Sequence, residues 1–238
     1  MAITLLLLLS MAVGGAFGQH SPLEFEYFTE LVHWNTLGLS VSAGKGLHVA
    51  FNGSHTHVMN VTSTDVGADV NFSAWKLVKT NIDGLNARTN FGISSLGNGR
   101  VLMFGGDRRG RALNDSFIFS LSTNEETGED MGTWTKTADG PSARYWHAMS
   151  SLGNGKVLLY GGRRGWDLLN DSFIFSLPTN EEPGEEKGTW TRTADGPSAL
   201  EKHAMSSLGN GTCLMYGGYD TKNVLSDSFI FSLSINKE

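Results

Sequence analysis

The sequence lacks several features that would point to a common class of protein. It has one cysteine in 238 residues, so it has no disulfide framework. Its net charge is −6, which argues against a nucleic-acid binder, because such proteins carry a basic surface. Apolar residues at helical spacing are scarce, and no apolar run beyond residue 18 is long enough to span a membrane. Glycine, in contrast, is abundant, with 30 residues.

The one long apolar run lies at the N-terminus. Residues 1–13 have the length of a secretory apolar core and are too short for a spanning helix. Small residues at Ala16 and Gly18 suit a cut before Gln19. We therefore expect residues 1–18 to be a signal peptide and residues 19–238 to be secreted without a membrane span; a buried strand or a membrane anchor is the alternative.

Acceptor sequences of the type Asn-X-Ser/Thr fit export, since secreted surface loops carry them. They begin at Asn52, Asn60, Asn71, Asn114, Asn170 and Asn210. At Asn114 and Asn170 the motif also belongs to a sequence repeat, which offers a second explanation for it.

That repeat dominates the rest of the chain. The stretch Lys-Val-Leu-Leu-Tyr-Gly-Gly at 156–162 has counterparts at 100–106 and 212–218, so the unit recurs every 56 residues. A short apolar run ended by two glycines predicts a buried strand that stops at a sharp turn. The paired glycines are Gly105 and Gly106, Gly161 and Gly162, and Gly217 and Gly218.

Each unit contains the pattern of four short strands, which we call A to D. In the best copy they are expected at His147–Leu152, Lys156–Tyr160, Asp171–Leu177 and Thr189–Thr193. Asn154 and Gly155 predict a tight A–B hairpin, and strand D carries a tryptophan, Trp134 in one copy and Trp190 in the next. Four antiparallel strands form a sheet whose two faces both need covering. Repeated units packed around an axis, as in a β-propeller, cover them; a solenoid or a β-sandwich is the alternative.

These features resemble the kelch repeat, which has the Gly-Gly strand end, a following aromatic strand and a Trp at fixed distance. Pro141, Arg144 and His147 also match the Pro-x-x-Arg-x-x-His start of the unit, although Leu200 replaces the arginine in the last copy. The resemblance implies an all-β, kelch-type β-propeller with about four four-stranded blades. We expect them at residues 31–80 (an eroded copy), 85–137, 141–193 and 197–233, and residues 22–31 as a strand that closes the last blade.

No motif indicates catalysis. The glycine-rich stretches at 105–110 and 161–165 lack the Gly-Lys-Ser/Thr of a P-loop, and His55 and His57 have no third metal ligand at a recognisable spacing. Cys213 lies in a repeated apolar strand and is expected in the core. We expect no cofactor and no metal. A propeller enzyme, such as a galactose oxidase-like oxidase or a glycan hydrolase, and a fragment of a longer kelch protein are the alternatives.

The loops indicate where a ligand would bind. In an up-and-down blade the B–C and D–A loops emerge on one face, and the A–B and C–D loops on the other. The C–D loops are acidic, whereas the B–C and D–A loops are rich in Arg and aromatic residues, which are enriched at binding hot spots. We therefore expect a module that binds a protein or a carbohydrate through the B–C/D–A face, with candidate residues Arg108, Arg109, Arg144, Tyr145, Trp146, Arg163, Arg164, Trp166 and Tyr219.

Overall fold

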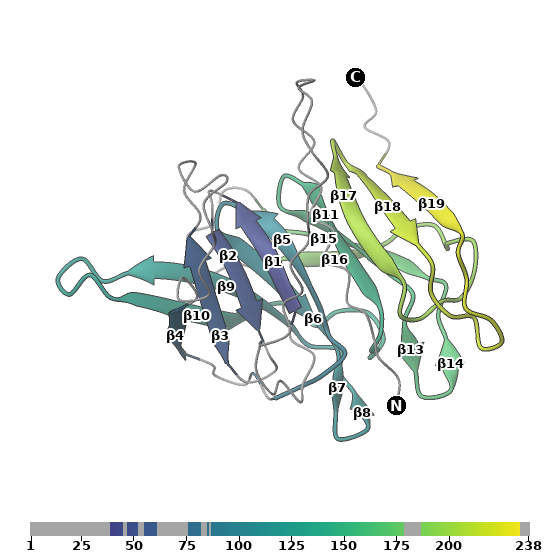
Figure 1. The fold of residues 1–238 in the computed structure, drawn as a ribbon, viewed down its shortest axis with the longest axis horizontal. Coiled ribbons are helices and arrows are strands. Elements are labelled where there is room, and N and C mark those ends of the chain that lie inside the picture. The colour runs from purple at the N-terminus through teal and green to yellow at the C-terminus, as the bar shows by residue number, and fades with distance from the viewer. Residues whose placement is uncertain are drawn as a thin grey trace, which may run out of the picture. The chain divides into compact units, whose positions relative to one another are not determined.

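The computed structural model describes residues 39–44, 47–51, 55–60, 76–81, 85, 87–178 and 187–233. The chain divides into two units, Met1–His33 and Trp34–Glu238, and all described residues lie in the second. The expected signal peptide at 1–18 and closing strand at 22–31 lie outside the described residues. Within them the regular structure is all β (Figure 1), and no helix there is long and apolar enough to cross a membrane.

The strands form successive blades in the order of the sequence repeat. Blade 1 contains β1 (Leu39–Gly44), β2 (Leu47–Phe51), β3 (Thr56–Asn60) and β4 (Lys76–Asn81). Blade 2 contains β5 (Gly92–Gly97), β6 (Arg100–Phe104), β9 (Ser116–Thr123) and β10 (Asp130–Lys136). Blade 3 contains β11 (Ala148–Gly153), β12 (Lys156–Tyr160), β15 (Ser172–Ser176) and β16 (Thr189–Arg192). Blade 4 contains β17 (Ala204–Gly209), β18 (Thr212–Tyr216) and β19 (Ser228–Ser232).

This architecture confirms the kelch-type propeller, including the eroded first copy. Within each blade neighbouring strands are antiparallel. Two features were not expected. Each B–C loop of blades 2 and 3 contains a small hairpin, β7 (Asp107–Arg108) with β8 (Arg111–Ala112), and β13 (Arg163–Arg164) with β14 (Asp167–Leu168). In addition, the outer strands β4 and β10 pair in parallel and join blades 1 and 2 into one sheet.

The A–B hairpins have the predicted tight turns. Asn154 and Gly155 both have positive φ, 51° and 70°, as a type I′ turn requires. The turns at Asn98 and Asn210 repeat this geometry with φ of 54° and 49°. Asparagine tolerates this backbone region better than most residues, which explains its recurrence at the turn.

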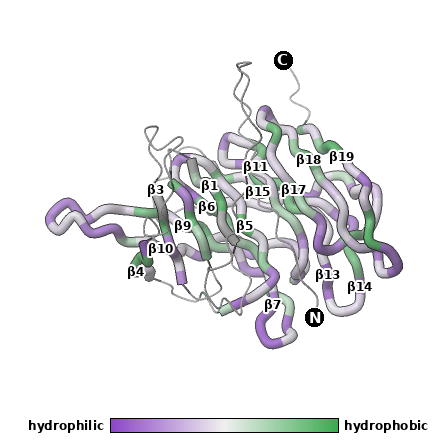
Figure 2. The backbone as a smooth tube through the Cα atoms, viewed as in Figure 1, coloured by the Kyte–Doolittle hydropathy of each residue, from purple (hydrophilic) through white to green (hydrophobic). Residues whose placement is uncertain are grey.

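The middle strands of blades 2 and 3, β6 and β12, are buried on both faces, as their continuous apolar sequence predicts. In β12, Val157 and Leu159 pack into the cluster shared with blade 2, whereas Leu158 packs with Cys213 of blade 4. Figure 2 shows the hydrophobic residues along the strands and the hydrophilic ones at the hairpin turns. Cys213 is in the core, as expected, and burial raises the pKa of its thiol to about 11, so the reactive thiolate is suppressed.

The paired glycines allow the backbones of successive blades to touch. A Cβ on Gly105 would lie 2.7 Å from the Arg144 carbonyl oxygen, and one on Gly161 would lie 2.7 Å from that of Leu200. At the same crossings the amides of Gly106 and Gly162 donate to these two carbonyls, at 2.9 and 2.8 Å. A side chain would therefore separate the blades and break these hydrogen bonds.

A buried arginine reinforces this crossing in blades 2 and 3. Arg144 donates two hydrogen bonds to the Asp171 carboxylate, at 2.6 and 3.1 Å, and one to the Gly161 carbonyl at 3.0 Å. Arg88 makes the same contacts with Asp115 and Gly105 in blade 2. Arg144 is thereby removed from the candidate binding residues, because its side chain is fully buried.

We predict that Arg144→Ala lowers the free energy of unfolding by about 3 kcal/mol, because it leaves the largely buried Asp171 carboxylate without its cation. Urea denaturation followed by circular dichroism measures the change. The matched control is Arg164→Ala in the exposed hairpin, which should cost less than about 0.5 kcal/mol. Equal midpoints for the two variants would contradict a structural role for Arg144.

Two buried histidines predict a loss of stability in mild acid. Burial lowers the pKa of His147 to about 3, helped by Arg144 and His203, and burial lowers that of His203 to about 4. Below the ordinary value of 6.5 the unfolded chain therefore binds more protons than the folded chain, so the free energy of unfolding falls as the pH drops toward 4.

We expect a lower urea midpoint at pH 5.5 than at pH 7.5, with little change between pH 7.5 and 8.5. His147→Gln should flatten this dependence, since it removes one of the two protonation sites. A midpoint that is the same at pH 5.5 and 7.5 would show that these imidazoles are not held neutral by the fold.

Candidate functional site

The structure brings the D–A and B–C loops together on blades 2, 3 and 4. Tyr145 and Arg163 exchange backbone hydrogen bonds of 3.1 and 2.8 Å, which fix the D–A loop before blade 3 against hairpin β13–β14. Glu201 and Tyr219 form the same pair one blade later, at 3.1 and 2.9 Å. The expected B–C/D–A face thus has a defined backbone frame, which we call the loop face.

The two small hairpins present cationic and aromatic side chains at their turns. Arg109 and Gly110 form the β7–β8 turn with φ of 53° and 81°, and Gly165 begins the β13–β14 turn with φ of 60°. Trp166, in the second turn, is 92% exposed. A large aromatic side chain held this far into solvent by a hydrogen-bonded hairpin has no packing role in the described part of the fold.

A ladder of backbone hydrogen bonds joins the D–A loops of neighbouring blades. The Trp146 amide donates to the Asn90 carbonyl at 3.0 Å, and the Lys202 amide donates to the Trp146 carbonyl at 2.9 Å. All three residues have positive φ, between 56° and 58°. This conformation is unfavourable for a tryptophan, so the ladder holds Trp146 in a strained backbone.

The Trp146 ring is also fixed from two sides. The Lys202 ammonium lies 3.9 Å from the ring centroid, and the Tyr145 ring packs edge-on at 4.9 Å. Tyr145 in turn donates from its hydroxyl to the Gly165 carbonyl at 3.3 Å in the β13–β14 turn. Tyr145, Trp146 and Lys202 therefore form a pre-organised group beside the hairpin that carries Trp166.

Not every predicted cation is available to a ligand. Arg163 Nε lies 3.1 Å from Oε2 of Glu201, and that carboxylate is buried. The N–H does not point at the oxygen, so the contact is an ion pair without hydrogen-bond geometry. Arg163 therefore compensates a buried charge, whereas Arg108, Arg109 and Arg164 are exposed.

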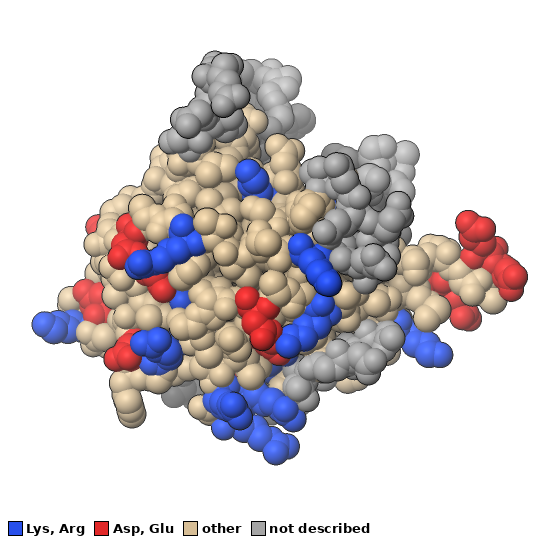
Figure 3. Space-filling model, turned by 180° about the vertical axis from the view of Figure 1, so that it is seen from behind, with Lys and Arg blue, Asp and Glu red and all other residues tan. Residues whose placement is uncertain are grey.

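The loop face has mixed charge. Arg164 lies 3.7 Å from Asp167 in its own hairpin, and Tyr219 donates from its hydroxyl to the Thr221 carbonyl at 2.7 Å. Figure 3 shows Lys and Arg side chains at the lower end of the molecule, where Figure 1 places β7–β8. Acidic side chains cluster at the tip of the β9–β10 hairpin, away from that region.

The buried histidines of the repeat lie apart from the exposed side chains of this face. Among the residues that the structure describes, no group of three or more His, Cys, Asp or Glu side chains could hold a metal ion. His147 and His203, the repeat histidines, are buried beneath the loop face and pack against Phe104 and Tyr160, with ring centroids 5.3 and 5.2 Å apart. The exposed groups of this face include the guanidinium groups of Arg108, Arg109 and Arg164 and the ring of Trp166.

Sequence reasoning missed Glu201 and the acidic partners of the buried arginines. Glu201 was a D–A loop residue without an assigned role, although Arg163 lies at the neighbouring B–C position. The Asn-Asp-Ser motif at 114–116 is also structural: Asp115 pairs with Arg88, and the Ser116 hydroxyl accepts from Trp190. The repeat therefore accounts for this motif without a glycan.

Comparison with known proteins agrees with the fold. Residues 38–237 match the KLHDC2/KLHL20/DRC7 kelch-repeats domain. The chain is similar to Adagio protein 3 of Arabidopsis thaliana, with 28% identity over 157 residues, which cover 63% of this chain and 23% of that protein. It is also similar to tRNA wybutosine-synthesizing protein 4 of Candida glabrata, with 29% identity over 164 residues, covering 65% of this chain and 22% of that protein.

The chain thus spans less than a quarter of the length of these relatives. The match to the kelch-repeats domain, in contrast, includes all four blades. Kelch domains commonly bind proteins, which agrees with a recognition surface built from loops on a fixed scaffold. The chain therefore belongs to the kelch-repeat family and has its β-propeller fold.

Proposed function

We propose that this kelch domain binds a protein segment through the loop face. The observation that carries the proposal is Trp166, a 92% exposed ring at the turn of a hydrogen-bonded hairpin. Exposed Arg164 precedes it, and the fixed group of Tyr145, Trp146 and Lys202 lies beside it through the Tyr145–Gly165 hydrogen bond. Rigid aromatic anchors flanked by arginine are typical of binding hot spots.

The exposed cations define the chemistry of the segment. Arg108, Arg109 and Arg164 offer planar guanidinium groups that suit carboxylates, so a segment with Asp or Glu beside an apolar residue fits the face best. A sulfated or carboxylated carbohydrate shares this chemistry and is the second candidate, because Trp166 offers a flat ring for a sugar to stack on. The propeller-enzyme alternative has less support, since the repeat histidines are buried and neutral.

We expect Trp166→Ala and Arg164→Ala each to weaken binding by about tenfold or more, since truncation of a hot spot costs about 2 kcal/mol. Arrays of acidic and neutral peptides and of glycans identify the ligand, and calorimetry then measures its affinity. Arg163 is left intact because its removal would leave the buried Glu201 carboxylate without its cation.

The matched control is Glu125→Ala with Glu126→Ala, which changes the exposed turn at the tip of β9–β10. It should leave affinity unchanged. If this control weakens binding while Trp166→Ala does not, the ligand uses the other set of loops.

We also propose that the protein is exported and glycosylated. The apolar residues 1–13 and the small residues at Ala16 and Gly18 support export. Among the acceptor sites, Asn114, Asn170 and Asn210 are exposed, so a glycan on them would not disturb the core. Asn52 and Asn71 lie outside the described residues, and the side chain of Asn60 is not described.

Secreted material from eukaryotic cells should begin at Gln19 on N-terminal sequencing and lose apparent mass on enzymatic deglycosylation. Asn210→Asp should remove one glycan. Asn154→Asp at the equivalent turn should remove none, because Asn154-Gly-Lys is not an acceptor sequence. A protein that keeps Met1 and stays inside the cell would contradict export.

A further inference from the structure

Each strand D in blades 2 and 3 inserts its tryptophan into the preceding blade. Trp134 donates from Nε1 to the Thr56 hydroxyl of blade 1 at 2.9 Å, and Trp190 donates from Nε1 to the Ser116 hydroxyl of blade 2 at 3.1 Å. Thr56 and Ser116 are the first residues of β3 and β9. The indole thus has the same acceptor position in both copies.

Two aromatic walls complete each site. Trp134 lies between Phe51 and Phe119, with ring centroids 5.4 and 5.2 Å away. Trp190 lies between Phe104 and Phe175, at 5.0 and 5.2 Å. One wall comes from the end of strand B in the preceding blade, and the other from strand C in the tryptophan's own blade.

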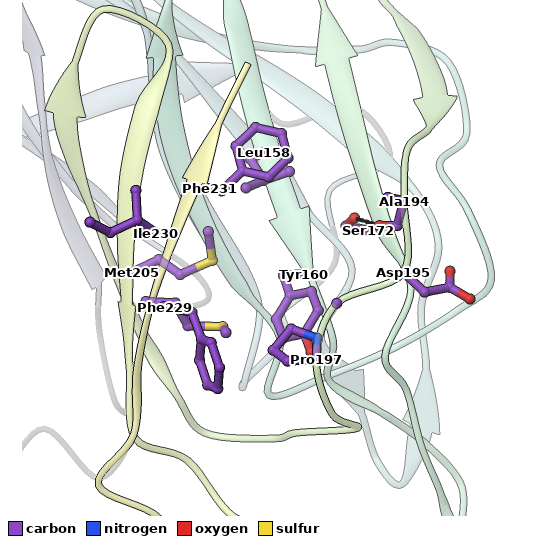
Figure 4. A pocket seen from close by; sticks show the side chains of 12 residues that line it. Leu158, Tyr160, Ser172, Ala194, Asp195, Pro197, Met205, Phe229, Ile230 and Phe231 are labelled. Atoms are coloured by element: carbon purple, nitrogen blue, oxygen red, sulfur yellow. Dashed lines mark hydrogen bonds between the residues drawn. The ribbon is translucent and has the colours of Figure 1, made fainter. Parts of the chain in front are cut away.

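A third site with these parts lies between blades 3 and 4. The repeat places Ser172 at the acceptor position, and Tyr160 and Phe231 at the two walls. These three residues line a pocket of about 200 Å³, together with Leu158, Met205 and Gly196. Figure 4 shows Phe231 on the β19 side of this space and Ser172 with Ala194 on the other. We call this pocket the tryptophan socket.

The socket has the chemistry for an indole. The Ser172 hydroxyl donates to the Ala194 carbonyl, so its oxygen lone pairs can still accept an N–H. The volume is below the roughly 300–1,000 Å³ of most small-molecule sites, so it suits one side chain. The socket is also continuous with the packed interface of blades 3 and 4, since Leu158, Tyr160 and Phe231 belong to both.

The adjoining strand edge can hold the backbone of an occupant. The described sheet of blade 4 has the order β17-β18-β19, whereas in blade 3 β15 pairs on that side with β16. Ile230 on β19 is 66% exposed. An added strand at this edge would place a residue opposite Phe231, as Trp134 lies opposite Phe119 and Trp190 opposite Phe175.

The filled sites also specify the residue two places before the tryptophan. Gly132 and Gly188 occupy that position, and a Cβ there would lie 2.6 Å and 1.9 Å from the rings of Phe119 and Phe175. Phe231 is the repeat equivalent of Phe119 and Phe175, and its ring lines the socket. Only glycine at this position leaves room for the ring.

We propose that the socket and the adjoining β19 edge, which pairs only with β18 among the described residues, bind, in trans, an extended protein segment with the pattern Gly-X-Trp. The strand pairs with β19, the indole enters between Tyr160 and Phe231, and its N–H is accepted by Ser172. This is β-strand addition with one specificity pocket. The socket borders the loop face through Ala194 and Gly196 of the D–A loop, but none of the side chains proposed to bind there lines it, so this proposal does not rest on the proposed function.

The test uses the full chain and a dye-labelled peptide with the sequence of residues 187–193, Lys-Gly-Thr-Trp-Thr-Arg-Thr, followed by fluorescence anisotropy. We expect saturable binding. In the peptide, Trp190→Ala should weaken binding by more than about tenfold, and Gly188→Val should do the same because its side chain meets the Phe231 ring. Equal affinity of these peptides and the unchanged one would overturn the proposal.

The hydrogen bond is tested separately. Ser172→Ala should weaken binding of the Trp peptide by about two- to tenfold, whereas Ser228→Ala, the exposed equivalent on blade 4, should not. A Trp190→Phe peptide keeps an aromatic ring at this position but lacks the N–H, so Ser172→Ala should not affect its binding. A similar loss with both peptides would show that Ser172 acts only through the fold.

Two other occupants would overturn the proposal in a recognisable way. Light scattering that shows a concentration-dependent dimer lost on Phe231→Ser would assign the socket to a second copy. Peptide binding that appears only after deletion of residues 22–31 would assign it to the chain's own N-terminal segment.

Discussion

The crossing of two backbones at the glycine pairs is the constraint on which the rest of the structure depends. A carbonyl oxygen of the next D–A loop lies only 2.7 Å from the position that a Cβ of Gly105 or Gly161 would take, and it accepts a hydrogen bond from the following glycine. Leu200 shows which part of this arrangement is required. It lacks the guanidinium of Arg144, yet its carbonyl still accepts from Gly162 at 2.8 Å. The close approach therefore holds the blades together, and the arginine adds an ion pair to it.

The middle strands could be predicted from the sequence because each short apolar run lies between a tight turn and a glycine pair, which excludes a buried helix. The limits of β12 agree with the prediction residue by residue, and β1 to β4 lie within residues 31–80, the range expected for the eroded copy, apart from the last residue of β4. The hairpins β7–β8 and β13–β14 could not be predicted, because their residues are little buried and show no alternation of apolar and polar side chains. Two residues on each side of a turn are too few to show a periodicity, and backbone pairing alone defines these hairpins.

Strand topology indicated which loops lie on the same side as one another, but it did not indicate which charged side chains are buried and which are exposed. A cation in a loop sequence gives no indication of burial, so Arg144 and Arg164 looked alike. A signal did exist: Arg88 and Asp115 are 27 residues apart, and so are Arg144 and Asp171, which is the pattern of a repeated internal pair. The signal for Glu201 was weaker, because Tyr145, the residue at the equivalent position of the preceding repeat, is not acidic. Arg144 and Arg163 are paired with the internal carboxylates of Asp171 and Glu201. The proposed binding through the loop face would therefore depend more on its aromatic residues than on its positive charge.

The two tryptophan sites are each built from two neighbouring blades. Blades 2 and 3 each supply a tryptophan to the blade before, and blades 1 and 2 each supply a hydroxyl and one aromatic wall. In the described chain, blade 3 supplies its hydroxyl and wall while β19 ends the sheet of blade 4. The loop face would select by charge and by exposed rings, which many partners can satisfy. The socket would select by shape, because the glycine and the indole it requires have no close substitutes.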